Sequence, residues 1–197
     1  MSTPATGSSG ESVFDQAIES LKSVEFRDEL VVSEIPAPAN LAPNAFALAA
    51  DVRPTKHAQD SEFATGRFIL LHDRLEPEPW SGPFRIVCYA QAPLETEIGT
   101  DPFLTEVAWS WLVDSLEARG ADYHLASGTV TRILSSGFGS LAEQGDGAQL
   151  ELRASWSPST PLIAPQVAAW GDLLCMLAGL PPESEGISLL AARRNKS

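Results

Sequence analysis

The chain of 197 residues is poor in cysteine and has no long hydrophobic run. Its two cysteines, Cys88 and Cys175, lie in apolar segments, so we expect two reduced core thiols, with a disulfide between them as the less favoured alternative. The longest apolar run is too short to cross a bilayer. The first residues lack both a basic region and an apolar stretch, so we expect a cytoplasmic protein without a secretory signal.

Basic side chains are also scarce. The chain has 13 lysines and arginines against 26 acidic residues, a formal net charge of −13. Such a body repels nucleic acids and anionic membranes unless a local basic patch intervenes. The only basic run, Arg193-Arg194-Asn195-Lys196, falls near the C-terminus. We therefore expect no direct nucleic-acid partner and no membrane partner, and interpret the acidity as favouring solubility.

Recognisable catalytic motifs are missing. His57, His72 and His124 lie far apart in the sequence, and neither cysteine belongs to a CxxC pair, so no metal site is predicted. The chain has no nucleophile elbow, phosphate-binding loop or dinucleotide fingerprint. We therefore assign no catalytic residue and no cofactor. An enzyme with a site outside these motifs is not excluded, although the sequence favours a non-enzymatic protein.

Hydrophobic periodicity predicts three helices and six short strands. The helices begin at Ser12, Pro102 and about Pro165, and Ser12 with Asp15 forms a weak capping box. The strands are expected at residues 29–35, 44–52, 67–72, 84–91, 128–134 and 149–156. The expected fold class is α+β: a mainly antiparallel sheet of five to six strands with two or three helices packed on one face. We expect a disordered segment at residues 1–11, one domain at 12–180 and a flexible tail at 181–197.

The most informative segment is DPFLTEVAWSWLVDSLEARG, residues 101–120. Asp101 suits an N-cap, Pro102 the first helical position and Gly120 the position after the helix. Trp109 and Trp111 fall near opposite edges of an apolar arc that is about twice as wide as one buried stripe requires. More than one neighbour must therefore cover this helix. The last helix is similarly apolar.

Three explanations fit this wide apolar arc. The two helices can cover each other while both lie on the sheet. Part of the surface, with Trp109 and Trp111 as anchors, can instead be a homodimer or partner interface, because tryptophan is enriched at interface anchors. A ligand pocket between helix and sheet, lined by the indoles, is the third explanation.

Four predicted strands each carry one arginine: Arg67, Arg85, Arg132 and Arg153. Side chains that share one face would form a positive patch for an anionic ligand or an acidic peptide. Residue parity puts Arg85 and Arg153 opposite the apolar positions of their strands, argues against Arg132 and leaves Arg67 undecided. The alternative is ordinary cross-strand pairing with carboxylates such as Glu151. For an enzyme, Arg85, Glu106 and Ser110 are the polar groups that we expect to converge in a pocket.

The chain resembles a bacterial family catalogued as domain of unknown function 3000. The resemblance rests on ATGRFILLHD (64–73), WSGPFRIVCYA (80–90), DPFLTEVAWSWLVDSL (101–116), the GTVTR and SGFGSL pieces, and LRASW (152–156). It covers nearly everything from Phe14 to Pro182 and implies an origin in high-GC Gram-positive (actinobacterial) organisms. It implies no activity, ligand or catalytic residue.

These observations favour a binding or accessory protein that acts through protein–protein contacts, as a homo-oligomer or with a partner. The expected ligand or partner surface comprises Trp109, Trp111, Arg67, Arg85, Arg153 and Glu106. The alternative is an enzyme or small-ligand binder, including a binder of an anionic ligand, with a pocket between sheet and helices.

Overall fold

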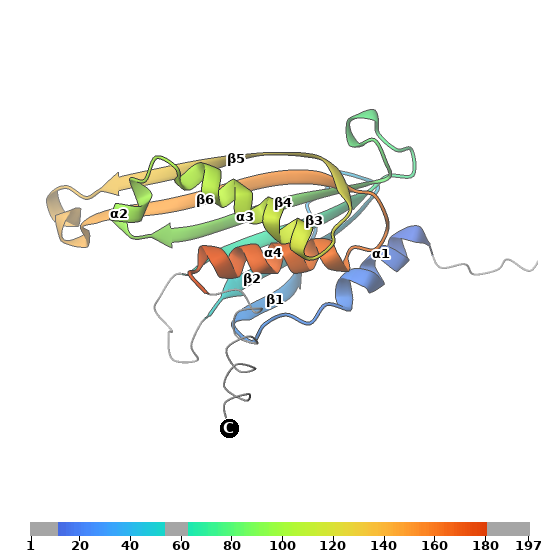
Figure 1. Ribbon diagram of the computed structural model, residues 1–197, viewed down its shortest axis with the longest axis horizontal. Coiled ribbons are helices and arrows are strands. Elements are labelled where there is room, and N and C mark those ends of the chain that lie inside the picture. Colours follow the sequence, from blue (N-terminus) through green and yellow to red (C-terminus); the bar gives the residue numbers. More distant parts are fainter. Residues whose placement is uncertain (1–11, 54–62, 181–197) are drawn as a thin grey trace, which may run out of the picture.

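The computed structural model describes residues 12–53 and 63–180. The expected disordered segment at 1–11 and the expected tail at 181–197 lie outside the described residues. The described chain forms one sheet with helices on one side (Figure 1). Its elements are α1 (Val13–Lys22), β1 (Leu30–Ile35), β2 (Asn44–Val52), β3 (Thr65–His72), η1 (Glu78–Trp80), β4 (Phe84–Leu94), α2 (Thr96–Gly99), α3 (Leu104–Ala118), β5 (Tyr123–Ser136), η2 (Gly139–Gln144), β6 (Asp146–Pro158) and α4 (Ala164–Leu177).

The sheet has the strand order β1-β2-β3-β4-β6-β5, and every neighbouring pair is antiparallel. This confirms the α+β class and the antiparallel sheet. All six predicted strands exist, but β5 is longer than the expected 128–134, and β4 and β6 also extend beyond their expected ends. In the extra residues, apolar and polar side chains alternate only weakly, so the sequence pattern does not mark them as strand. Backbone hydrogen bonds to the adjacent long strand keep them extended. The short helices α2, η1 and η2 were not predicted.

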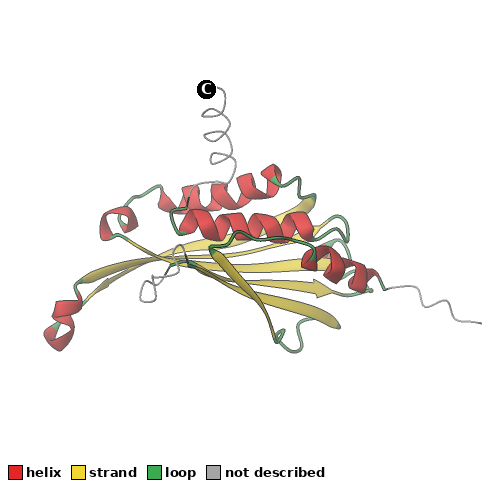
Figure 2. Cartoon of the chain, turned by 90° about the horizontal axis from the view of Figure 1, so that it is seen from below, coloured by secondary structure: helices red, strands yellow, loops and turns green. Residues whose placement is uncertain are grey.

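Alternation along the strands divides the sheet into two faces. The face that carries the helices, here called the helix face, holds the core residues Leu48, Ala50, Phe68, Leu70, Ile86, Cys88, Ala90, Leu150, Leu152, Ala154 and Trp156. The opposite face, here called the open face, carries the residues between them. Figure 2 shows the longer helices together on one side of the sheet. The register therefore decides which polar side chains share the open face.

The two apolar helices lie side by side on the helix face. α4 contacts strands β2, β3 and β4, whereas α3 packs against α4 and reaches β5. α4 is the central element, since Val167, Trp170, Leu173 and Leu174 are all fully buried. This mutual covering is the first of the three explanations for the wide apolar arcs. An antiparallel sheet under two adjacent helices needs each helix to be apolar on its sheet side and on its partner side.

The helix ends confirm two of the predictions made for them and correct two others. Ser12 and Asp15 form the capping box at the start of α1. Gly120 takes a φ of +65° just after α3, as a C-terminal glycine should. Asp101 is not the N-cap of α3 and Pro102 is not its first residue, because α3 begins only at Leu104. Pro102 lies in the turn before the helix. The Asp101 carboxylate instead accepts the Phe103 backbone N–H at 2.8 Å, because residues 101–103 form a turn before the helix.

Candidate interaction surfaces

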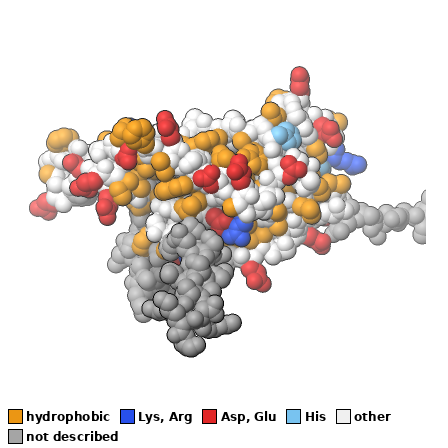
Figure 3. Space-filling view, viewed as in Figure 1, with side chains coloured by type: hydrophobic (Ala, Val, Ile, Leu, Met, Phe, Trp, Pro, Cys, Tyr) orange, Lys and Arg blue, Asp and Glu red, His pale blue; other side chains and the backbone are white. Residues whose placement is uncertain are grey.

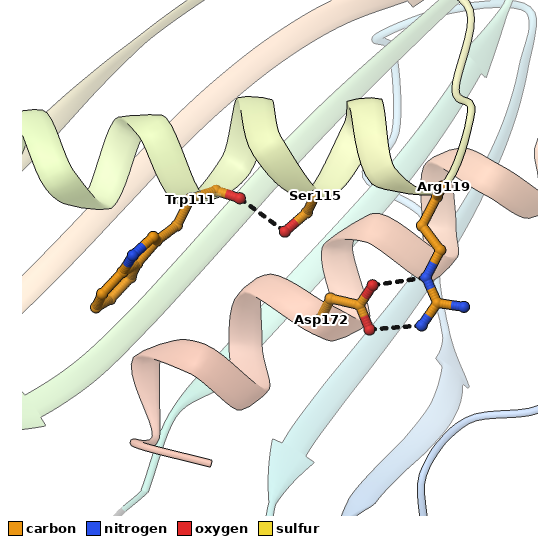
Figure 4. A network of polar contacts seen from close by, with 4 residues as sticks. All are labelled: Trp111, Ser115, Arg119 and Asp172. Atoms are coloured by element: carbon orange, nitrogen blue, oxygen red, sulfur yellow. Dashed lines mark hydrogen bonds and ion pairs between the residues drawn. The ribbon is translucent and has the colours of Figure 1, made fainter. Parts of the chain in front are cut away.

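The two tryptophans of α3 both pack against the core. Each is only partly exposed. The ring of Trp109 lies over Gly128 of β5, where a Cβ atom would approach Trp109 Cζ3 to 2.7 Å. Figure 4 shows the indole of Trp111 leaving α3 on the side where α4 lies, while the Trp111 carbonyl accepts the Ser115 hydroxyl at 2.7 Å. The indoles thus cover the two flanks of α3, and neither is a fully exposed anchor.

Other hydrophobic side chains are more exposed than the indoles. Phe103 is 64% exposed, and Val107, one turn further along α3, is 40% exposed. Ile98 of α2 and Leu134 of β5 are 47% and 57% exposed. Leu134 is near α2, because its Cδ2 lies 3.3 Å from where a Cβ of Gly99 would be. We call Ile98, Phe103, Val107 and Leu134 the apolar patch.

The apolar patch lies on the helix face, beside the edge of the sheet. Figure 3 shows hydrophobic side chains gathered over α2 and the start of α3, with carboxylates among them. Glu97, Asp101 and Glu106 are exposed on these segments. Sequence reasoning missed Phe103 and Leu134: it placed Phe103 inside the helix and gave Leu134 no role. No local signal marks them, because Phe103 is the residue just before α3 begins and Leu134 lies within β5, two residues before its end.

Strand β5 is an open edge of the sheet. Among the described strands it pairs with β6 alone, over a register that runs from Ser127 to Ser136 without interruption. These ten residues carry no proline and no carboxylate. Their single charge, Arg132, donates to the Asp101 carbonyl at 2.6 Å and thereby holds the turn before α3 against the strand. The opposite edge, β1, has six residues and is followed by Pro36 and Pro38.

The four strand arginines fall on both faces. The cross-strand register joins Arg67 to Tyr89 and Tyr89 to Arg153, and Arg85 has the same parity as Tyr89 on β4. Three of the four therefore share the open face. Arg132 pairs with the buried Leu150 and lies on the helix face, as its parity in the sequence suggested.

Arg85 has a structural role in the sheet. Its guanidinium donates to Ser155 Oγ at 2.7 Å and to Ser157 Oγ at 3.1 Å on β6. It also donates to the Leu125 carbonyl at 3.1 Å, inside the bulge of β5, where Leu125 takes a φ of +54°. Partial burial lowers the pKa of the Arg85 guanidinium from its ordinary value. This side chain therefore fastens β4, β6 and the β5 bulge together.

A groove on the open face lies between Arg67 and Arg153. It encloses about 610 Å³. Its lining residues are Ala49, Ala50, Asp51, Thr65, Gly66, Arg67, Ile69, Val87, Tyr89, Gln91 and Arg153. The Tyr89 hydroxyl donates to Gln91 Oε1 at 2.6 Å, and Arg153 lies over the Tyr89 ring with its Cζ atom 5.7 Å from the centroid. Burial, followed by the nearby Glu151 carboxylate, raises the pKa of the Tyr89 phenol.

The polar groups expected to form an enzyme pocket do not meet. Arg85 lies on the open face, whereas Glu106 and Ser110 are exposed on α3, on the opposite side of the sheet. The Ser110 hydroxyl donates to the Val107 carbonyl of its own helix at 2.8 Å. The structure thus does not bring these three residues together, because the sheet and the core beneath α3 lie between Arg85 and the other two.

The remaining titratable groups do not form a catalytic cluster in the described part of the chain. His72 is buried between the rings of Phe14 and Phe84, at centroid distances of 5.5 and 4.7 Å. Burial lowers the pKa of His72 and raises that of the buried Cys88 thiol. Within residues 12–53 and 63–180, no three His, Cys, Asp or Glu side chains are grouped to hold a metal ion. No helix in that same part is long and apolar enough to cross a membrane.

Comparison with known proteins gives a single finding about the whole chain. No curated protein and no solved structure matches it. A family model described as "Protein of unknown function (DUF3000)" matches residues 11–188, which includes every element of the sheet and its helices. The chain therefore belongs to the DUF3000 family of proteins of unknown function.

Proposed function

We propose that this protein is a binding or accessory protein that docks a segment of another protein chain at β5 and the apolar patch. The observation that carries the proposal is that the edge strand β5 and the apolar patch lie next to each other. Ten consecutive residues of β5, from Ser127 to Ser136, pair with β6 on one side and with no other described strand, and they lie beside the four exposed hydrophobic side chains of the apolar patch. Edge strands offer a row of unpaired backbone groups, and an extended partner segment satisfies them by adding one more strand.

The contrast between the two sheet edges supports this assignment. β1 is short and is followed by prolines, which are devices that protect an edge from pairing. β5 has neither device between Ser127 and Ser136. Ten residues of strand span about 33 Å, which is enough for a peptide to pair along many backbone groups. The two edges therefore differ in their protection, and the stretch from Ser127 to Ser136 is the one more available for pairing.

Charge complementarity indicates the chemistry of the partner. Glu97, Asp101 and Glu106 are exposed around the apolar patch, while the nearby Arg132 is engaged with backbone carbonyls. A segment that alternates apolar and basic residues would bury its apolar side chains on the patch and bring its cations to these carboxylates. A second copy of this chain would bring the same carboxylates and the same net charge of −13, so self-association at this edge is disfavoured.

The first experiment selects peptides against the purified chain. A displayed library of random 12-residue peptides is panned on the wild-type protein, and enriched peptides are titrated by fluorescence anisotropy. Peptides that alternate apolar residues with lysine or arginine are expected. Phe103→Ser and Leu134→Ser should each weaken them about tenfold or more, since each removes a large apolar contact. Leu75→Ser is the matched control, because Leu75 is 87% exposed in the β3–β4 connection.

The second experiment measures mass in solution. Light scattering of the wild-type chain should give a mass close to 21.0 kDa. A stable dimer that dissociates in Leu134→Ser would assign the edge to a second copy and overturn the proposed partner. Enriched peptides that bind all three variants equally would also overturn it, because the surface would then not involve the patch.

A further inference from the structure

The open face carries a second feature that protein docking at β5 does not use. Arg67, Tyr89 and Arg153 are direct cross-strand neighbours on β3, β4 and β6. With two inter-strand spacings between them, the arginine backbones are about 10 Å apart, and the tyrosine stands between. Ala49 continues the row on β2 as a residue too small to fill the space beside Arg67. The register thus places one arginine on each side of the Tyr89 ring.

The residues on one side of this row are small or apolar, whereas Asp51, Thr65 and Gln91 border its other side. Ala49 lies in the same row on β2, and Ile69 and Val87 are the apolar pair of the next row. A wet antiparallel sheet normally presents long polar side chains on its exposed face. Here the small residues leave a groove of about 610 Å³, within the size range of small-molecule sites.

The charge balance of the groove is asymmetric. Arg153 donates to Glu151 at 3.1 Å, and Asp51 lies 4.0 Å from Arg53. The side chain of Arg67 makes no hydrogen bond or ion pair with any residue in 12–53 or 63–180. An arginine that lines a groove without a carboxylate partner has N–H donors available for a ligand. Two of these donors bind a carboxylate through parallel hydrogen bonds, so a carboxylate is the group that pairs best with it.

We propose that this groove binds a small, flat organic carboxylate. The carboxylate pairs with Arg67, and the flat apolar body lies on Ile69 and Val87 against the Tyr89 ring. Arg153, held over that ring by Glu151, bounds the far side and donates to a second carboxylate where the ligand carries one. The hydrogen bond from Tyr89 to Gln91 keeps the phenol fixed, so the aromatic wall is preformed and costs little ordering on binding.

The test uses naphthalene-2,6-dicarboxylate as the probe on the full-length protein. Binding is followed by two-dimensional ¹H–¹⁵N NMR, with the matching neutral dicarboxamide and inorganic phosphate as comparison ligands. Saturable shifts at the amides of Arg67, Tyr89 and Arg153 are expected with the dicarboxylate. The dicarboxamide should bind more weakly for lack of charge, and phosphate more weakly for lack of a flat body.

Two variants and one control locate the site. Arg67→Gln should weaken the probe about tenfold, the effect of losing one charge-assisted hydrogen-bonded pair. Tyr89→Leu should weaken it while leaving its charge dependence intact. Arg74→Gln removes an exposed arginine from the β3–β4 connection and should leave binding unchanged. The absence of saturable binding, equal binding of phosphate, or equal weakening by Arg67→Gln and Arg74→Gln would each overturn the proposal. None of these outcomes bears on docking at β5, which lies at the sheet edge.

Discussion

Arg119 and Asp172 join the C-terminal end of α3 to the middle of α4 through two parallel hydrogen bonds. The Arg119 Nε and Nη2 atoms donate to the two Asp172 carboxylate oxygens at 2.6 and 2.7 Å (Figure 4). Asp172 is the only charged residue of α4. This bidentate pair is the polar fastening of a helix pair that is otherwise held by apolar contacts.

We expect Asp172→Asn to lower the free energy of unfolding by about 1 kcal/mol, because the pair is bidentate but partly exposed. Urea denaturation at low and high salt measures this loss, which should shrink as salt rises. Glu34→Gln is the matched control: the single contact from Lys22 to Glu34 spans 3.3 Å between well-exposed side chains. A cost for Glu34→Gln as large as that for Asp172→Asn would contradict the prediction.

The two fully buried tryptophans of the core differ in how their indole nitrogens are satisfied. Trp156 Nε1 donates to Gln166 Oε1 at 2.8 Å, and Gln166 in turn donates to the Asp122 carbonyl at 3.0 Å. Trp170 Nε1 has no hydrogen-bond partner among the residues that the structure describes. Gln166→Leu should therefore lower the free energy of unfolding by about 1–3 kcal/mol, since it leaves buried polar atoms unpaired. Thermal and urea unfolding measure the loss.

Trp170→Phe is the companion to that substitution. It removes an N–H that is already unpaired, so only volume and contacts are lost, and the ring of Phe68 at 5.6 Å still has an aromatic neighbour. Its cost should fall at or below that of Trp156→Phe, which also breaks the bond to Gln166. The reverse order would show that the hydrogen bond contributes little.

Gly128 should not tolerate a methyl group. An added Cβ would overlap the Arg153 carbonyl of β6 and meet the Trp109 ring at 2.7 Å. Gly128→Ala should therefore lower the free energy of unfolding by about 1–3 kcal/mol and shift the tryptophan fluorescence, because Trp109 must move. Gly147→Ala is the control on β6, where an added Cβ meets nothing within 4 Å. Equal effects of the two substitutions would contradict the proposed contact.

Buried His72 should make stability depend on pH. Its pKa is lowered by burial, and Asn44 Nδ2 lies 3.3 Å from His72 Nδ1, a contact that suits a neutral ring accepting at that atom. The unfolded chain then binds a proton more readily than the folded one. The stabilising contribution is complete above about pH 6.5 and is lost as pH falls toward the lowered pKa.

Urea unfolding between pH 5 and 8 measures this contribution. His72→Leu should remove the part of the pH dependence that lies below about 6.5. His124→Gln should retain it, because His124 is more exposed at the start of β5. If both variants keep the wild-type profile, other groups control the pH dependence of folding.

Local pattern was enough to predict most of the elements, because their signals depend on near neighbours alone. The Ser12–Asp15 box and Gly120 satisfy helix ends through residues within one turn, so their roles follow from spacing. The start of α3 did not follow, because the turn at residues 101–103 is held by Arg132, from a strand about thirty residues later. Long-range contacts of this kind leave no local pattern.

The candidate surfaces show the same division. Parity within β4 and β6 placed Arg85 and Arg153 opposite the core, but only the register of β3 against β4 put Arg67 beside Tyr89. Arg85 shares the open face with Arg67 and Arg153, but its guanidinium is occupied by hydrogen bonds to Ser155 and Ser157 and is not available to a ligand. Which arginine remains available for a ligand is a property of neighbours in space.

The amino-acid sequence by itself determined the α+β class, the apolar character of both long helices and the absence of a recognisable catalytic motif, since these follow from composition and short periodicities. The tertiary structure decided which surfaces stay uncovered. α4 packs over β2–β4, and α3 packs beside α4. In this arrangement Trp109 and Trp111 are partly buried against the core, whereas Phe103 before α3 and Leu134 on β5 remain exposed. The exposure of a side chain depends on all the elements that pack around it, so the sequence of one segment alone does not determine it.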